Sequence, residues 1–201
     1  MSTKDRILEA AVDLFAEKGY NDVSIREITR AVGIKESSLY NHFASKQMIL
    51  DEIFDIMRKK YEDMTPSKET AADMLEKLSS EEFLEMGIKA FQLYMGDPLI
   101  IKIWRIISIE RFRNDRAKEF FINELMDNPI HYQASIFEMM MKKGLIKESD
   151  SLVLAREFYS YILYIYFRFF ETEPGKDPVN DPEIQKMIAD HMLFMGRVIQ
   201  K

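Results

Sequence analysis

The sequence contains no cysteine, which excludes disulfide bonds and thiolate metal sites. Glycine and proline are also few, with 7 and 6 among 201 residues, and most glycines stand where helices are expected to stop. No segment shows a sustained alternation of apolar and polar residues, so no β-sheet is expected. The composition therefore predicts an all-α protein.

Long hydrophobic runs are absent as well. The most apolar run covers residues 159–170 and is interrupted by Ser160 and Arg168, so it falls short of the roughly 20 residues that span a bilayer. The N-terminal segment lacks the apolar core and the small-residue cleavage site of a secretion signal. We therefore expect a soluble, cytoplasmic protein with no membrane partner.

Patterns typical of catalytic and metal sites are missing too. The three histidines are His42, His131 and His191, and none stands at a metal-ligand spacing from another. No glycine-rich phosphate loop and no nucleophile elbow occurs. The sequence therefore predicts no enzyme activity, no catalytic or metal-binding residues and no cofactor.

The formal net charge is −6, from 28 basic and 34 acidic residues. An acidic surface argues against non-specific nucleic-acid binding, which needs a basic face. Residues 1–50 are nevertheless neutral, so the whole excess of acid lies after residue 50. The N-terminal part can bind DNA if its basic groups converge on one face.

Three short amphipathic helices are predicted near the N-terminus. The first covers residues 3–18 and ends at Gly19. The second begins at Ser24, because Ser24 and Glu27 have the spacing of a capping box. Gly33 marks the tight turn that follows this helix.

The third predicted helix covers residues 36–43, with Leu39 and Phe43 facing inward. Two short helices joined by a tight turn form a helix-turn-helix, which places its second helix in the major groove of DNA. The exposed positions carry groups that hydrogen-bond to base edges or phosphates. The predicted DNA-binding residues are Arg26, Lys35, Glu36, Ser37, Ser38, Tyr40, Asn41, His42 and Lys46.

The N-terminal residues closely resemble the DNA-binding domain of the tetracycline-repressor (TetR) family. The matching stretches are ILEAAVDLFAEKGY and VSIREITRAVGIKESSLYNHFASKQMIL. The resemblance implies that Tyr40, His42 and Lys46 hold phosphates. It also implies that Lys35, Ser37, Ser38 and Asn41 contact bases or phosphates, and that Arg26 reaches a base edge or the backbone.

Glu36 does not fit simply into such a surface, because phosphates repel its carboxylate. Three interpretations stay open from the sequence: the side chain accepts a hydrogen bond from a cytosine amino group, faces solvent, or pairs with Lys35.

Methionine and aromatic residues are abundant after residue 80. Such side chains fill cores and interfaces, and together they also line adaptable apolar cavities. The family resemblance implies a small-molecule pocket in this part, with Trp104 either lining it or sealing the core. The expected ligand-binding residues are Phe91, Tyr94, Trp104, Ile107, Phe137, Met140, Tyr159, Leu163 and Tyr166.

Two long helices are predicted over residues 150–171 and 181–200, separated by a proline-rich loop over 173–182. The first of them is apolar on two faces and therefore needs two partners. A second copy of the chain would cover one face and form a four-helix bundle. The expected interface residues are Leu154, Tyr161, Ile165, Arg168, Met187, His191, Phe194 and Met195.

The sequence thus predicts a helix-turn-helix domain over residues 1–47 and a helical ligand-binding and dimerisation domain over 48–201. The predicted function is a dimeric regulator of transcription, a repressor, that binds double-stranded DNA and responds to a small apolar effector. Two alternatives remain: an activator or ligand-independent silencer, and a helical binding module or enzyme whose N-terminal helices do not bind DNA.

Overall fold

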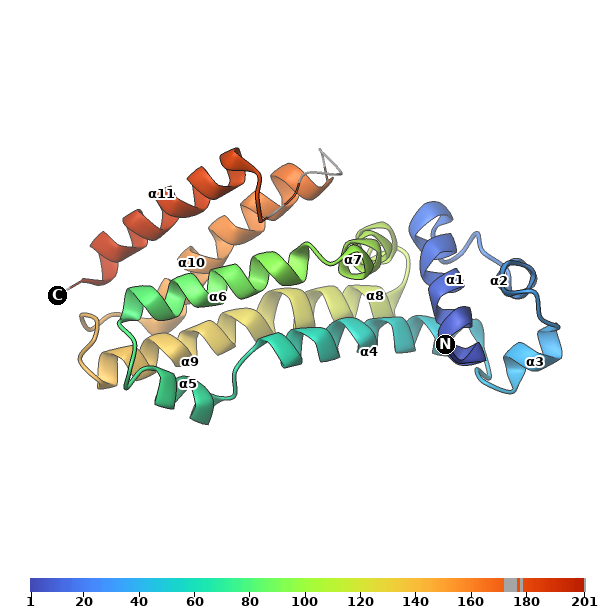
Figure 1. Cartoon of the computed structure of the whole chain (residues 1–201), viewed down its shortest axis with the longest axis horizontal. Coiled ribbons are helices and arrows are strands. Elements are labelled where there is room, and N and C mark those ends of the chain that lie inside the picture. Colours follow the sequence, from blue (N-terminus) through green and yellow to red (C-terminus); the bar gives the residue numbers. More distant parts are fainter. Residues whose placement is uncertain (172–176, 178, 201) are drawn as a thin grey trace. The chain divides into compact units, whose positions relative to one another are not determined.

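The computed structural model describes residues 1–171, 177 and 179–200 (Figure 1). Throughout this described part every regular element is a helix, as predicted. None of its helices is long and apolar enough to cross a membrane. In chain order, the elements are α1 (Thr3–Lys18), α2 (Ile25–Val32), α3 (Glu36–Tyr40), α4 (Lys46–Met64), α5 (Lys68–Met74), α6 (Ser80–Met95), α7 (Pro98–Glu110), α8 (Asp115–Phe120), the π-helical η1 (Phe121–Asp127), α9 (Asn128–Lys142), α10 (Ser151–Tyr166), the π-helical η2 (Phe167–Glu171) and α11 (Pro182–Ile199).

The first of two compact units comprises residues 1–61 and 97–124. It joins α1, α2, α3 and most of α4 to α7 and α8, and α1 packs against both α2 and α7. Apolar side chains from each of these helices are buried in the unit. Phe15, Ile28 and Leu39 come from the first three helices, and Ile103 and Ile107 come from α7.

The division into units differs from the domain boundary that the sequence suggests after residue 47. That position lies inside α4, which runs without a break from Lys46 to Met64. In addition, α7 buries its apolar stripe in the same unit as α1, so the helix-turn-helix shares its unit with a segment that follows it by about 50 residues. Helix periodicity shows that α7 has an apolar face, but not which helix covers that face.

The second unit comprises residues 62–96 and the described part of 125–201. Here α9 packs against α10, and the rings of Phe137 and Phe158 meet edge to face with centroids 6.0 Å apart. A smaller apolar cluster of Ile165, Phe169 and Ile184 joins the end of α10 and η2 to α11, which runs alongside α10 (Figure 1). Five of the ten residues of the loop expected over 173–182 lie outside the described residues.

The end of α3 differs from the prediction. The helix covers Glu36–Tyr40 rather than residues 36–43. Beyond Tyr40 the chain tightens into a turn in which the His42 and Phe43 N–H groups both donate to the Leu39 carbonyl, at 2.9 and 3.0 Å. Leu39 and Phe43 are nevertheless both buried, as their spacing predicts. The predicted DNA-binding residues of this segment therefore still face away from the core.

Candidate nucleic-acid interface

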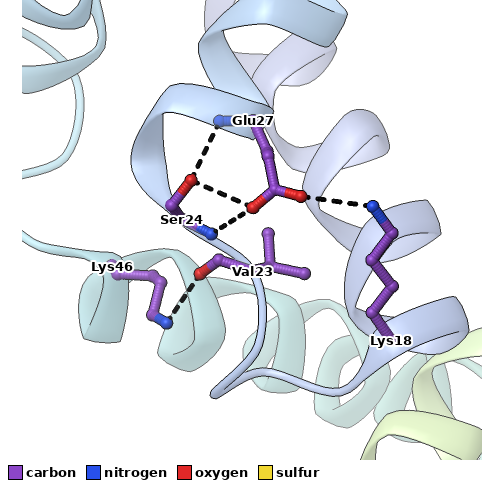
Figure 2. A network of polar contacts seen from close by, with 5 residues as sticks. All are labelled: Lys18, Val23, Ser24, Glu27 and Lys46. Atoms are coloured by element: carbon purple, nitrogen blue, oxygen red, sulfur yellow. Dashed lines mark hydrogen bonds and ion pairs between the residues drawn. The ribbon is translucent and has the colours of Figure 1, made fainter.

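A capping box fixes the start of α2 (Figure 2). The Ser24 hydroxyl accepts the Glu27 backbone N–H at 3.3 Å, and the Glu27 carboxylate accepts the Ser24 backbone N–H at 2.8 Å. The second carboxylate oxygen accepts from Lys18 at the end of α1, at 3.2 Å. These hydrogen bonds, above all that from the Ser24 backbone, lower the pKa of Glu27 to about 2. The box therefore both caps α2 and ties it to α1.

A glycine turn sets the angle between α2 and α3. Gly33 has φ 74° and ψ 36°, in the left-handed region where a Cβ is disfavoured. The Ile34 N–H donates back to the Thr29 carbonyl at 3.0 Å, which closes the end of α2. Arg6 of α1 donates to the Val32 carbonyl beside this turn. The turn is thus held by its own backbone and by α1.

The outer face of α3 presents most of the predicted DNA-binding residues. Leu39 and Phe43 anchor the segment from within, while the Tyr40 side chain is 50% exposed. The face carries an ammonium, hydroxyls, an amide and an imidazole, all of which hydrogen-bond to base edges or phosphates. Its exposed or half-exposed residues are Lys35, Ser37, Ser38, Tyr40, Asn41 and His42.

Glu36 pairs with Arg26, not with Lys35. The Arg26 Nε donates to the Glu36 carboxylate at 2.9 Å, and the two side chains are 81% and 44% exposed. This contact links the first turn of α2 to the first residue of α3. Both predicted residues therefore lie together on the surface, as one ion pair.

Lys46 has a different environment from the one that the sequence suggests. Its ammonium donates to the Val23 carbonyl at 2.8 Å (Figure 2). It also donates to the Tyr20 carbonyl at 2.8 Å and lies 4.3 Å from the centroid of the Tyr20 ring. Burial lowers the pKa of Lys46. Two of its three N–H donors thus hold the α1–α2 turn, where the prediction has the ammonium facing a phosphate.

Glu110, at the end of α7, holds the same turn from the other side. Its side chain is fully buried, and its carboxylate accepts the Tyr20 backbone N–H at 2.9 Å and the Asn21 side-chain amide at 3.4 Å. Gly19 permits this approach, because a Cβ there would lie 3.0 Å from the carboxylate. Sequence reasoning missed Glu110; the one available signal is its place three and four residues after Ile107 and Ile106, on the apolar stripe of α7.

The cations of the N-terminal helices are mostly engaged within the protein. Among the described residues, only Arg30 and Lys35 in this region have neither an acidic partner nor a carbonyl partner, and both are exposed. The engaged ones are Lys4 with Glu52, Arg6 with the Val32 carbonyl, Lys18 with Glu27, Arg26 with Glu36, and Lys46 with two carbonyls. Few charges are therefore available for DNA phosphates.

The expected ligand-binding residues are divided between the two units. Trp104 and Ile107 are buried in the first unit, while the other seven belong to the second. In the second unit Phe91 and Tyr166 line an apolar cavity with Ile88, Ile162 and Ile184. This cavity measures about 30 Å³, against about 300–1,000 Å³ for ligand pockets.

Within the described residues, no three His, Asp or Glu side chains gather as a metal site requires.

The expected interface residues divide into two groups. Leu154, Ile165 and Met195 are buried by the chain's own side chains. The His191 ring is also buried, with its Nε2 3.0 Å from the Phe158 carbonyl. Phe194 and Arg168 are exposed, and Tyr161 and Met187 are half-buried.

A surface groove on α10 and α11 contains Tyr161, His191 and Phe194. It also contains Tyr164, which is 52% exposed and is not among the expected interface residues. The groove thus gathers partly exposed aromatic rings from both helices.

Residues 7–53 match the family described as "Bacterial regulatory proteins, tetR family". The chain is 26% identical over 178 residues to the HTH-type transcriptional repressor KstR2 of Rhodococcus jostii, covering 86% of this chain and 80% of that protein. It is 34% identical over 130 residues to KstR2 of Mycobacterium tuberculosis, covering 62% of this chain and 65%, or just under two thirds, of that protein. The negative regulator IcaR of Staphylococcus aureus is 45% identical over 49 residues, 24% of this chain and 26% of that protein.

Solved structures share the fold over nearly the whole chain. A TetR-family transcriptional regulator from Mesorhizobium loti superposes with a TM-score of 0.75 at 19% identity, covering 99% of this chain and 97% of that one. A transcriptional regulator from Aquifex aeolicus gives 0.72 at 20% identity, covering 96% and 99%. At such identities the likeness establishes the helical fold alone.

Replacing Glu110 tests whether it supports the α1–α2 turn. Glu110→Leu should lower the free energy of unfolding by about 1–3 kcal/mol, because the buried Tyr20 N–H loses its acceptor. Glu110→Gln keeps an oxygen acceptor and should cost less. Urea unfolding of the full chain measures both, with the exposed Glu119→Gln as control at about 0.5 kcal/mol or less. A Glu110→Leu variant as stable as wild type would contradict the assignment.

The Glu27 carboxylate should make stability depend on pH. Its pKa is lowered from 4.5 to about 2 by folding, so its contribution is present above pH 4.5 and is lost as the pH falls toward 2. Glu27→Gln should therefore be less stable than wild type at pH 7, and the difference should shrink between pH 4.5 and 2. Urea midpoints across this range measure it, with the exposed Glu9→Gln controlling for the loss of one surface charge. A pH-independent gap would refute the prediction.

Proposed function

The chain belongs to the TetR family of bacterial DNA-binding transcriptional regulators, and we propose that it is a repressor that binds a pseudo-palindromic operator as a homodimer in the cytoplasm. The exposed polar face of α3 carries this proposal, because Leu39 and Phe43 anchor the helix while Tyr40 and its neighbours remain available to DNA. Relatives named as repressors or negative regulators favour repression over activation. The family consists of regulators, which argues against the alternative of an enzyme.

In this proposal α3 enters the major groove, and residues next to α3 bind the phosphate backbone of the DNA. Ser37, Ser38 and Asn41 contact bases or phosphates, as the family resemblance implies. Lys35, Tyr40 and His42 bind phosphates, and Arg30 joins them because it is exposed and unpaired. Lys46 contributes through the α1–α2 turn that it holds.

We propose that the dimer forms through the outer faces of α10 and α11. Tyr164, Leu193 and Phe194 are each more than half exposed there, which is unusual for large apolar side chains so close together. Packing these helices against those of a second copy would bury them in a four-helix bundle. Such a dimer has two-fold symmetry, which matches two half-sites of inverted sequence.

We also propose a small apolar effector that binds in the second unit, at the cavity beside Phe91 and Tyr166. The lining of this cavity is almost entirely apolar. Because the cavity measures only about 30 Å³, the effector must bind a conformation in which it is larger. In this proposal the enlarged conformation binds DNA less well, so the effector weakens operator affinity. The operator then weakens effector affinity by the same factor.

Selection of bound duplexes from random DNA tests operator binding. The full chain should enrich a palindromic sequence, and operator affinity should fall steeply with salt. Lys35→Ala should weaken binding similarly on all duplexes and reduce the slope of log K against log salt by about 1 per subunit. Lys102→Ala, which removes an exposed, ion-paired lysine of α7, is the matched control. No enriched palindrome would count decisively against the proposed function.

The dimer proposal predicts that an acid at Phe194 breaks the assembly. Phe194→Asp places a charge in a face that the proposed interface would desolvate. Sedimentation should show monomers, and affinity for the full operator should fall toward that for one half-site. Phe112→Asp, at a phenylalanine that is 82% exposed outside α10 and α11, should leave the dimer intact. A Phe194→Asp protein that remains dimeric would rule out this interface.

A further inference from the structure

The structure pairs one residue of α2 with one of α3, and we propose that Glu36 positions Arg26 to read a guanine in each half-site of the operator. Arg26 and Glu36 stand ten residues apart, on either side of the Gly33 turn, and are joined at 2.9 Å. The inference rests on the proposed operator binding and adds the base and the pair of residues that select it.

The pairing leaves the guanidinium able to read a base. A guanidinium has five N–H donors, and Glu36 accepts the one on Nε. Among the described residues Arg26 has no other partner, so the four donors on its two terminal nitrogens face solvent. These two nitrogens form the fork that binds guanine O6 and N7 together in the major groove.

Stability does not account for this ion pair. The two side chains are 81% and 44% exposed, and ion pairs in contact with solvent contribute little to folding. A carboxylate on a DNA-facing helix also weakens attraction to phosphates at every sequence. Glu36 therefore lowers general affinity for DNA, and the benefit that offsets this loss is orientation of the arginine.

Orientation affects specificity because a free arginine side chain is long and flexible. Fixing Nε restricts the guanidinium before DNA arrives, so less conformational freedom is lost on binding the base. The carboxylate also makes contacts of this guanidinium with nearby phosphates less favourable than contacts with a base. Glu36 thus acts as a positioning residue, and Arg26 as the residue that contacts the base.

Modified operators provide the direct test. The full chain first selects its operator, and each operator guanine is then replaced in turn by 7-deazaguanine, which lacks the N7 acceptor. At one guanine per half-site the replacement should lower wild-type affinity at least about five-fold. The same replacement should not change the affinity of Arg26→Ala.

Glu36 is tested by the ratio of affinities for the operator with G·C or with A·T at that position. Glu36→Ala should reduce this ratio at least about three-fold while binding to unrelated DNA stays equal or tightens. Glu36→Gln keeps an oxygen acceptor for the Arg26 Nε and should retain most of the ratio. In the Arg26→Ala background, Glu36→Ala should have no further effect on it. Glu52→Ala, which removes another exposed, ion-paired carboxylate, is the matched control.

Three results would overturn the inference while leaving operator binding intact. Arg26→Ala would weaken all duplexes equally if the arginine binds phosphate. An unchanged ratio in Glu36→Ala would exclude positioning. A base preference lost with Glu36 even in the Arg26→Ala background would mean that the carboxylate reads cytosine itself. Failure of the wild-type chain to select any operator would instead remove the proposed function, and this inference with it.

Discussion

The backbone of Tyr20 lies between two opposite charges. Its N–H donates to the buried carboxylate of Glu110, and its carbonyl accepts from the ammonium of Lys46. Together with the Val23 carbonyl, these contacts fix the turn that joins α1 to α2. The capping box at Ser24 begins directly after this turn, so the direction of α2 depends on it. The position of α3 depends in turn on α2, through the left-handed turn at Gly33.

The interface that results has few free cations. Most basic side chains in this region hold other parts of the protein, in a chain whose net charge is −6. Non-specific attraction to DNA comes chiefly from unpaired lysine and arginine. A surface made mainly of hydroxyl, amide, phenol and imidazole groups relies more on matching geometry than on charge. In the proposed operator complex, weak general attraction to DNA and selective binding would both follow from this arrangement.

Local patterns predicted the helix-turn-helix well, because each of its signals lies within a few residues. The spacing of Ser24 and Glu27 predicted the capping box, and the four-residue interval of Leu39 and Phe43 predicted the anchor of α3. The environment of Lys46 could not be read in this way, because its ammonium reaches back more than 20 residues to carbonyl groups that carry no side-chain signal. In the second unit, apolar stripes identified buried faces but not their partners. Ile165 and Met195 were therefore expected at an interface, and the chain itself covers them.

The unit that holds the DNA-binding face is discontinuous along the chain, since residues 1–61 and 97–124 complete it together. Glu110 meets Tyr20 across 90 residues, and α7 supplies part of the apolar core. A ribosome releases the helix-turn-helix long before it releases α7. Until α7 has been synthesised, the nascent N-terminal segment therefore lacks the Glu110 carboxylate and part of its apolar core. The DNA-binding unit is therefore complete only after residues 62–96 of the second unit have been made, and still before the chain supplies Ile162 and Ile184, which line the proposed effector cavity.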